Sequence, residues 1–213
     1  MRKLDLLVLV VVFCGWSSGA SAAPIEWTVA SGGNGHFYEY VGDPIPAPND
    51  WPDQQANAEA RGGYLATITS EAENRFISTV LGVGALGGCT CVWLGGYQNL
   101  TSPSYSEPGG GWEWVTGEPW AYTRWSGGEP NNAGGGTTEN YLTTWFSPDT
   151  TNVSWNDHYP NGSGRYIVEW DSNPVPEPNT ALLLSLGLVG IATRRRNCLF
   201  ASPVLASRPS LAL

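Results

Sequence analysis

The spacing of apolar residues predicts two short helices in the first half of the chain. The first helix begins after Asp50, a residue type that caps helix N-termini, and ends at Gly62-Gly63, where a left-handed residue is favoured. The second helix begins after Ser70, and Glu73 stands three positions later as in a capping box. Its apolar residues recur on one helical face: Phe76, Ile77, Val80 and Leu81.

Alternation typical of strands occurs before, between and after these helices. Residues 23–49 predict one or two strands, the segment 64–68 predicts a strand between the helices, and the segment 166–170 predicts a closing strand. Beyond Gly82 the pattern shows no further helix, only short aromatic strands and long glycine-rich loops. Helices early and irregular strands later indicate the α+β class.

Both ends of the chain carry patterns of sorting signals. Residues 1–22 have a basic start, an apolar run and a small-residue exit, which predicts a secretory signal peptide cleaved before Ala23. Near the other end, Pro176-Glu177-Pro178 precedes an apolar stretch over 180–193 and a cluster of arginines over 194–196. The stretch is short for a bilayer span of about 20 residues, although a single-pass anchor remains an alternative.

The C-terminal pattern resembles the PEP-CTERM sorting signal of exported bacterial proteins. That resemblance implies processing by an exosortase, delivery to the cell surface or extracellular matrix, and transient or permanent anchoring in the membrane through the C-terminal segment. A tail over 197–213 follows the arginines, where the family usually stops within a few residues. The expected division is therefore signal peptide 1–22, domain 23–172, sorting segment 173–196 and a tail of unassigned role.

The net charge of −9 hides a more acidic domain. Residues 23–172 contain 17 acidic residues and four arginines, and the chain's one lysine is Lys3. Nucleic acid is not an expected partner, because phosphate contacts need lysine and arginine gathered on one face. Cys89 and Cys91 are the domain's only cysteines, and the sequence leaves open whether they form a strained bridge.

Oxygen-bearing side chains recur in the loops of the late half. They are Glu129, Asn131, Glu139, Asn156 and Asp157. A hard cation such as Ca²⁺ takes six to eight oxygen ligands, whereas soft metals find no ligand cluster because His36 and His158 are isolated in the sequence. Three carboxylates repel one another without a cation, so we expect Ca²⁺ to order these loops as well as to fill them.

A series of motifs between Trp51 and Trp170 resembles a C-type lectin-like domain. The motifs are, in chain order, LATITS, SEAENRFI, VWLGG, WEW, GGEPNN, Glu139-Asn140, Trp155-Asn156-Asp157 and YIVEW. The resemblance implies two helices, small antiparallel sheets and long calcium-binding loops.

The same resemblance implies a ligand set. Glu129, Asn131, Glu139, Asn156 and Asp157 would bind Ca²⁺, and the peptide bond before Pro130 would be cis. The first four would also contact two neighbouring sugar hydroxyls. The Glu-then-Asn order implies sugars of the mannose, glucose or fucose type, and therefore a mannose-type glycan or exopolysaccharide as partner.

The resemblance also implies that both framework disulfides are absent. The aligned positions carry Ala58, Tyr141, Val168 and a residue near Tyr159 or Asn161. A native bridge commonly contributes ~2 to 5 kcal/mol, so the aromatic core, the calcium ion or both must offset the loss.

Three classes of function fit to different degrees. The ligand set favours an exported calcium-dependent lectin, and the alternative is a non-sugar adhesion or matrix protein with calcium structural or absent. An enzyme is not expected, because Glu129 and Glu139 are assigned to the metal and the two histidines are scattered. Trp155 is predicted to be a core residue. For Trp120, Tyr122 and Trp125, core packing is favoured over stacking on a sugar.

Overall fold

A computed structural model describes residues 23–42, 49–86, 91–133, 138–145, 150–162 and 164–174. Its contacts divide the chain into Met1–Pro174 and Val175–Leu213, and the second unit lies outside the described residues. The predictions for the signal peptide, the apolar segment, the C-terminal tail and Cys89 also fall outside them. Within the described ranges, no helix is long and apolar enough to cross a membrane.

The two predicted helices form, as α1 (Trp51–Ala60) and α2 (Glu71–Thr79). At the start of α1, the backbone N–H of Asp50 donates to Asp53 Oδ2 at 3.2 Å. At the start of α2, Ser70 Oγ accepts from the backbone N–H of Glu73 at 3.2 Å. The predicted apolar face is corrected at Val80, which is 50% exposed because the helix ends one residue before it. Two 3-10 turns, Val29–Ser31 and Val83–Ala85, were not predicted.

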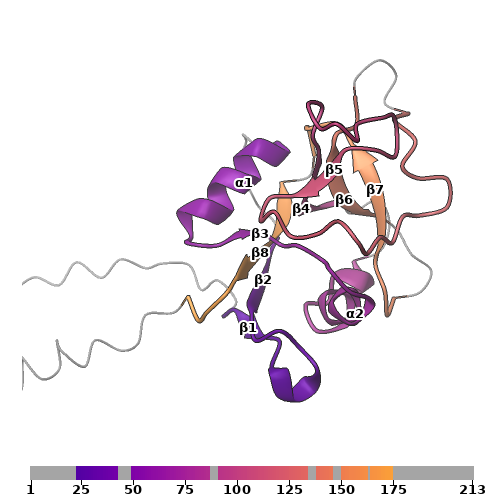
Figure 1. Cartoon of the computed structure of the whole chain (residues 1–213). Coiled ribbons are helices and arrows are strands. Elements are labelled where there is room, and N and C mark those ends of the chain that lie inside the picture. The colour runs from indigo at the N-terminus through magenta and orange to yellow at the C-terminus, as the bar shows by residue number, and fades with distance from the viewer. Residues whose placement is uncertain are drawn as a thin grey trace, which may run out of the picture. The chain divides into compact units, whose positions relative to one another are not determined.

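The strands form one connected sheet in the order β1-β2-β8-β4-β6-β7, with β3 added to β8 and β5 added to β4. Their bounds are β1 Ile25–Glu26, β2 Phe37–Val41, β3 Tyr64–Leu65, β4 Val92–Gln98, β5 Trp112–Trp114, β6 Tyr141–Trp145, β7 Ser154–His158 and β8 Arg165–Trp170. Figure 1 shows α1 and α2 apart, with β2, β8 and β4 drawn between them. The α+β class is confirmed.

One strand pair corrects the expectation of small antiparallel sheets. Strand β4 lies parallel to β8, with Val92 opposite Arg165 and Trp93 opposite Tyr166. The β6–β7 hairpin lies between them in sequence, and the closing strand β8 returns along β4 in the same direction. This parallel pair joins the β1-β2-β8 half of the sheet to the β4-β6-β7 half.

The predicted strand 64–68 is shorter than expected, because from Thr67 the backbone no longer bonds to the backbone of β8. Only Tyr64–Leu65 pairs as β3. The N–H of Ala66 donates to the Ile167 carbonyl at 2.9 Å. The N–H of Thr67 donates to Glu169 Oε2 at 2.9 Å. The close crossing of this segment and β4 requires a glycine, since a Cβ at Gly95 would lie 2.4 Å from the Leu65 carbonyl oxygen.

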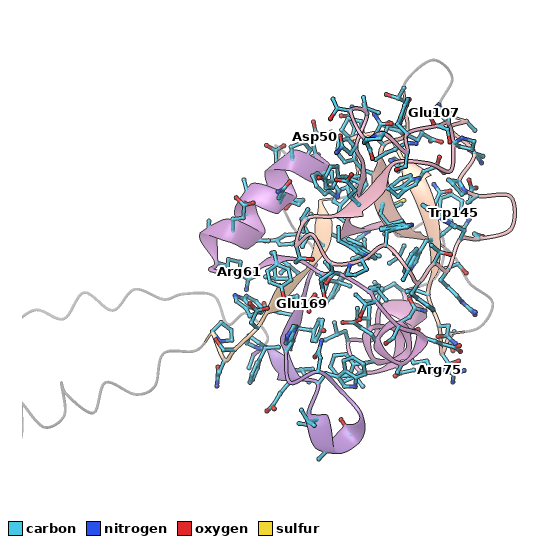
Figure 2. All side chains as sticks on the ribbon, viewed as in Figure 1. Asp50, Arg61, Arg75, Glu107, Trp145 and Glu169 are labelled. Atoms are coloured by element: carbon cyan, nitrogen blue, oxygen red, sulfur yellow. The ribbon has the colours of Figure 1, made fainter. Side chains whose placement is uncertain are left out.

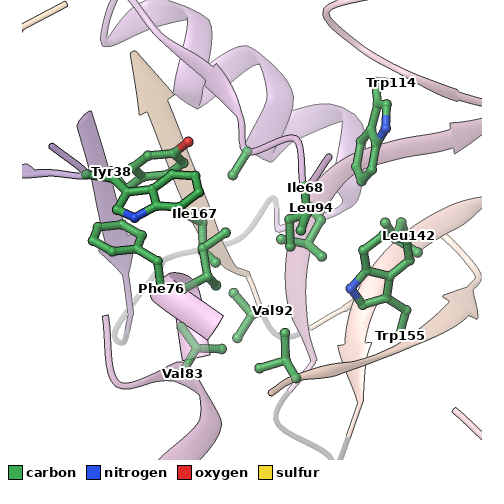
Figure 3. Packing of buried hydrophobic residues seen from close by; sticks show 14 of the residues in the cluster. Tyr38, Ile68, Phe76, Val83, Val92, Leu94, Trp114, Leu142, Trp155 and Ile167 are labelled. Carbon is green, nitrogen blue, oxygen red and sulfur yellow. The ribbon is translucent and has the colours of Figure 1, made fainter. Parts of the chain in front are cut away.

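The core consists of two apolar clusters. The larger one runs from the N-terminal strands to the β6–β7 hairpin, and Figure 3 shows Tyr38 and Phe76 at one end and Leu142 and Trp155 at the other. Trp155 is fully buried, as predicted. The second cluster contains Ala58 and Val168, both fully buried. Apolar packing therefore fills two of the positions at which the resemblance places cysteines.

Candidate functional site

The backbone brings the two ligand motifs together. Trp155 on β7 donates its N–H to the Arg124 carbonyl at 2.8 Å, and its carbonyl accepts from Ser126 N–H at 2.8 Å. This pairing fixes the segment that leads into Glu129 beside the strand that carries Asn156 and Asp157. The EPN and WND motifs, 26 residues apart from Asn131 to Asp157, consequently lie in contact.

The segment 129–133 is a turn wrapped around a carboxylate. The Glu129–Pro130 peptide bond is cis, and Asn132 has a left-handed backbone with φ of 48°. The N–H of Asn131 lies 3.1 Å from both carboxylate oxygens of Asp157, and the N–H of Asn132 donates to Oδ2 at 2.7 Å. Asp157 is almost fully buried beneath the turn.

Glu139, which precedes β6, joins the same turn. Its Oε2 accepts from the N–H of Ala133 at 2.7 Å, and its own N–H donates to Asn132 Oδ1 at 3.0 Å. Asn131 Oδ1 accepts from the N–H of Ala133 at 2.7 Å. Four of the five predicted ligands, Glu129, Asn131, Glu139 and Asp157, therefore belong to one connected cluster.

Asn156 is adjacent on β7 and mostly buried. Its amide nitrogen donates to the backbone carbonyl of Asp157. This bond turns the amide towards its own strand. No hydrogen bond joins it to the turn among the described residues.

The charged forms of Glu129 and Glu139 are disfavoured in this cluster. Burial raises the pKa of Glu129 to about 7, and hydrogen bonding to Asp157 and the charges of Asp157 and Glu139 act in the same direction. Burial and the charge of Asp157 also raise the pKa of Glu139, against the opposing hydrogen bond from Ala133. Among the described residues, no hydrogen-bond partner reaches the buried Oε2 of Glu129.

These observations fit a hard divalent cation. The donors are all oxygens, the clustered charge is negative, and a buried carboxylate oxygen lacks a partner. In the described part of the chain, no three His, Cys, Asp or Glu side chains are grouped as a metal site. This holds for the three carboxylates of the predicted set, Glu129, Glu139 and Asp157, which are not gathered as a metal site in this arrangement.

The aromatic residues before the EPN motif pack against the core. Trp120, Tyr122 and Trp125 are half-buried against the larger cluster. The Trp125 ring lies 6.0 Å from that of Trp155, in an edge-to-face arrangement, and the Tyr122 ring lies 5.6 Å away. The favoured core interpretation agrees with this packing.

His36, which is isolated in the sequence, belongs to a second polar cluster in the fold. Its Nδ1 lies 2.7 Å from Glu169 Oε1. The Tyr38 hydroxyl lies 2.6 Å from Glu73 Oε1 and 3.0 Å from Glu169 Oε1. Glu169 lies among the packed side chains, whereas Arg75 points outward from α2 (Figure 2).

Glu73 of this cluster also belongs to the predicted capping box, of which one bond forms as expected and the other is shifted by one residue. Glu73 Oε2 accepts from the N–H of Thr69 at 2.7 Å, so its carboxylate serves the residue before Ser70. The sequence held one sign of this cluster, which is Glu169 inside the apolar run of the closing strand. A buried carboxylate needs partners, so its position pointed to a polar cluster.

Comparison with known families identifies two segments. The sequence model described as "Lectin C-type domain" matches residues 47–172. The one described as "PEP-CTERM protein-sorting motif" matches residues 174–196.

Individual relatives cover the chain in part. Halomucin of Haloquadratum walsbyi is 32% identical over 155 residues, which are 64% of this chain and 1% of halomucin. Ladderlectin of Oncorhynchus mykiss is 30% identical over 91 residues, which are 43% of this chain and 44% of ladderlectin. The chain thus spans a small fraction of one relative and under half of the other.

A solved structure supports the fold alone. The cow CD23 C-type carbohydrate-recognition domain, crystallised in the presence of a GlcNAc2Man3 oligosaccharide, matches with a TM-score of 0.50 and 20% identity. The match covers 71% of this chain and 95% of that domain.

Proposed function

The chain belongs to the C-type lectin domain family, and from this premise we propose that it is an exported, calcium-dependent carbohydrate-binding protein. The observation that carries the proposal is the convergence of the 129–131 turn, Glu139 and Asp157, with a buried oxygen of Glu129 left without a partner. A divalent cation would relieve both the unpaired oxygen and the repulsion between the carboxylates. The proposal is a binding function and includes no enzymatic reaction.

The chain's own residues would divide two tasks. Glu129, Asn131, Glu139, Asn156 and Asp157 would hold the calcium ion. When bound, that ion supplies coordination positions for two neighbouring sugar hydroxyls. Carboxylate oxygens of Glu129 and Glu139 would accept hydrogen bonds from the sugar hydroxyls. Amide N–H groups of Asn131 and Asn156 would donate to the hydroxyl oxygens. The Glu-then-Asn order favours mannose-type sugars.

Calcium and sugar binding can be tested in sequence. We expect Ca²⁺ to raise the thermal unfolding midpoint of the protein, EDTA to reverse the shift, and retention on mannose resin to require Ca²⁺. A calcium-dependent shift without binding to any member of a broad glycan panel would instead support the adhesion or matrix alternative. Absence of both effects would contradict the proposal.

Sugar preference provides a sharper test. The double substitution Glu129→Gln with Asn131→Asp exchanges the order of the acidic and amide side chains while keeping their approximate size. We expect calcium binding to persist and preference to move from mannose towards galactose. Unchanged mannose preference would place the sugar contacts elsewhere.

Export follows from the C-terminal sorting motif, and its finer consequences are part of the proposal. We propose that the signal peptide is cleaved before Ala23, that an exosortase processes the segment over 173–196, and that the protein resides at the cell surface or in the extracellular matrix. Mass spectrometry of the exported protein tests this. An intact C-terminus on the exported form would contradict processing and leave the membrane-anchored alternative.

A further inference from the structure

The segment around Asn132 presents three successive backbone N–H groups to two carboxylates. The N–H groups of Asn131 and Asn132 contact Asp157, and that of Ala133 donates to Glu139. Successive N–H groups in a turn that includes a left-handed residue form a concave anion-binding nest. Asn132, with φ of 48°, supplies the left-handed position.

The side chain of Asn132 also binds Glu139. Its Oδ1 accepts from the N–H of Glu139 at 3.0 Å, while the N–H of Ala133 donates to Glu139 Oε2 at 2.7 Å. Glu139 is thus held at both its backbone and its carboxylate. Asparagine suits the position because it tolerates a left-handed backbone better than most residues and carries a short amide oxygen.

We infer that Asn132 is a positioning residue in the metal-free protein. Its N–H holds the carboxylate of Asp157, and its Oδ1 holds the backbone of Glu139, whose carboxylate is bound by the neighbouring Ala133 N–H. The turn thus gives each of the two carboxylates a backbone N–H donor, at 2.7 Å in both cases. The described part of the ligand loop is therefore preformed before the metal arrives. This inference builds on the proposed function and revises the expectation that calcium orders these residues.

Amide hydrogen exchange of the full chain in EDTA tests the inference without any metal. We expect the Glu139 N–H to be protected in the wild type, to lose protection in Asn132→Gly, and to retain it in Asn132→Asp. Glycine keeps the left-handed backbone but removes the acceptor, whereas aspartate keeps an oxygen acceptor. An unprotected Glu139 N–H in the wild type, or full protection in Asn132→Gly, would overturn the inference.

Calcium titration of the same proteins tests the consequence. We expect Asn132→Gly to weaken calcium binding about tenfold, the loss that one net hydrogen bond produces. Its unfolding midpoint in EDTA should stay near the wild-type value. Thr138→Ala is the matched control, because Thr138 is exposed and its hydroxyl accepts from the Asn140 amide, its one side-chain hydrogen bond within the described residues. The calcium affinity of this variant should be unchanged.

The two hypotheses fail separately. If the wild type binds no calcium, the proposed function is wrong, and exchange at Glu139 in EDTA still decides whether Asn132 holds the carboxylates. If the wild type binds calcium while the Glu139 N–H keeps full protection in Asn132→Gly, the positioning role is wrong and the proposed function stands.

Discussion

Single side chains differ in importance according to what packs around them. Leu142 on β6 is fully buried in the larger cluster that also contains Trp155, the residue before the WND ligands. A Cβ added to Gly96 would lie 2.8 Å from Leu142 Cδ2, which shows how closely β4 and β6 approach there. Leu100 has the same chemistry but is 52% exposed.

These two leucines form a matched pair for a stability test. Leu142→Ala should lower the free energy of unfolding by about 2 to 5 kcal/mol, because it removes buried apolar contacts and leaves a cavity. Leu100→Ala should change it by no more than about 0.5 kcal/mol. Urea denaturation measures both. Equal losses would contradict the burial assignment.

At the scale of elements, the N-terminal strands are attached to the domain through a buried polar cluster. His36 precedes β2, Tyr38 lies within it, and their partners are Glu73 on α2 and Glu169 on β8. Trp27 adds a stacked contact with Phe76 at 5.6 Å between ring centroids. The attachment therefore combines aromatic packing with ionisable groups.

This cluster predicts that stability falls as pH rises. The hydrogen bond that His36 donates to Glu169 raises the pKa of His36 despite opposing burial, and the negative charges of Glu169, Asp171 and Glu73 act in the same direction. A raised pKa in the folded state means that the stabilising contribution is full below about pH 6.5 and is lost as pH rises through the raised value. Burial and Glu169 likewise raise the pKa of Glu73, so its contribution is also lost as pH rises above its unfolded value.

The measurement is the free energy of unfolding at pH 6 and pH 8 in EDTA. The wild type should be less stable at pH 8, and His36→Gln should reduce that difference. A wild type that gains stability towards pH 8 would contradict the prediction.

The sequence predicted elements whose causes are local. Both helices were predicted because capping residues and apolar spacing lie within each segment. The His36–Glu169 contact joins residues 133 positions apart, and the parallel pairing of β4 with β8 depends on the fold of everything between them. Neither leaves a periodic pattern in the sequence.

The candidate site shows the same division. The residues proposed as ligands were found through the resemblance, because the family's motifs occur in a fixed order. The contacts made by Asn132 were not, since one asparagine after EPN does not reveal a left-handed backbone or a bond to Glu139.

At the scale of the whole molecule, negative charge dominates the domain. The segment 23–172 contains 17 acidic residues and four arginines, and two of those arginines, Arg61 and Arg75, already contact Glu39 and Glu71. Excess charge of one sign destabilises a compact state through self-repulsion, which dissolved ions screen.

We therefore expect sodium chloride to stabilise the protein. Raising it from low concentration to about 0.5 M, where the screening length is only a few ångströms, should raise the unfolding midpoint in EDTA. Thermal scans over a salt series measure the effect. A midpoint that stays constant or falls would show that local ion pairs outweigh the net repulsion.

The fully buried pair Ala58 and Val168 has a consequence for where the domain can fold. Apolar packing at these positions does not depend on the oxidation state of the surroundings, so the second cluster can assemble in a reducing cytoplasm as readily as outside the cell. We expect dithiothreitol to leave the unfolding midpoint nearly unchanged in a thermal scan. A large decrease would reveal a stabilising bridge elsewhere. If the midpoint is unchanged, export of this protein requires a route compatible with early folding, or a chaperone that delays folding, and it requires no oxidising enzyme at its destination.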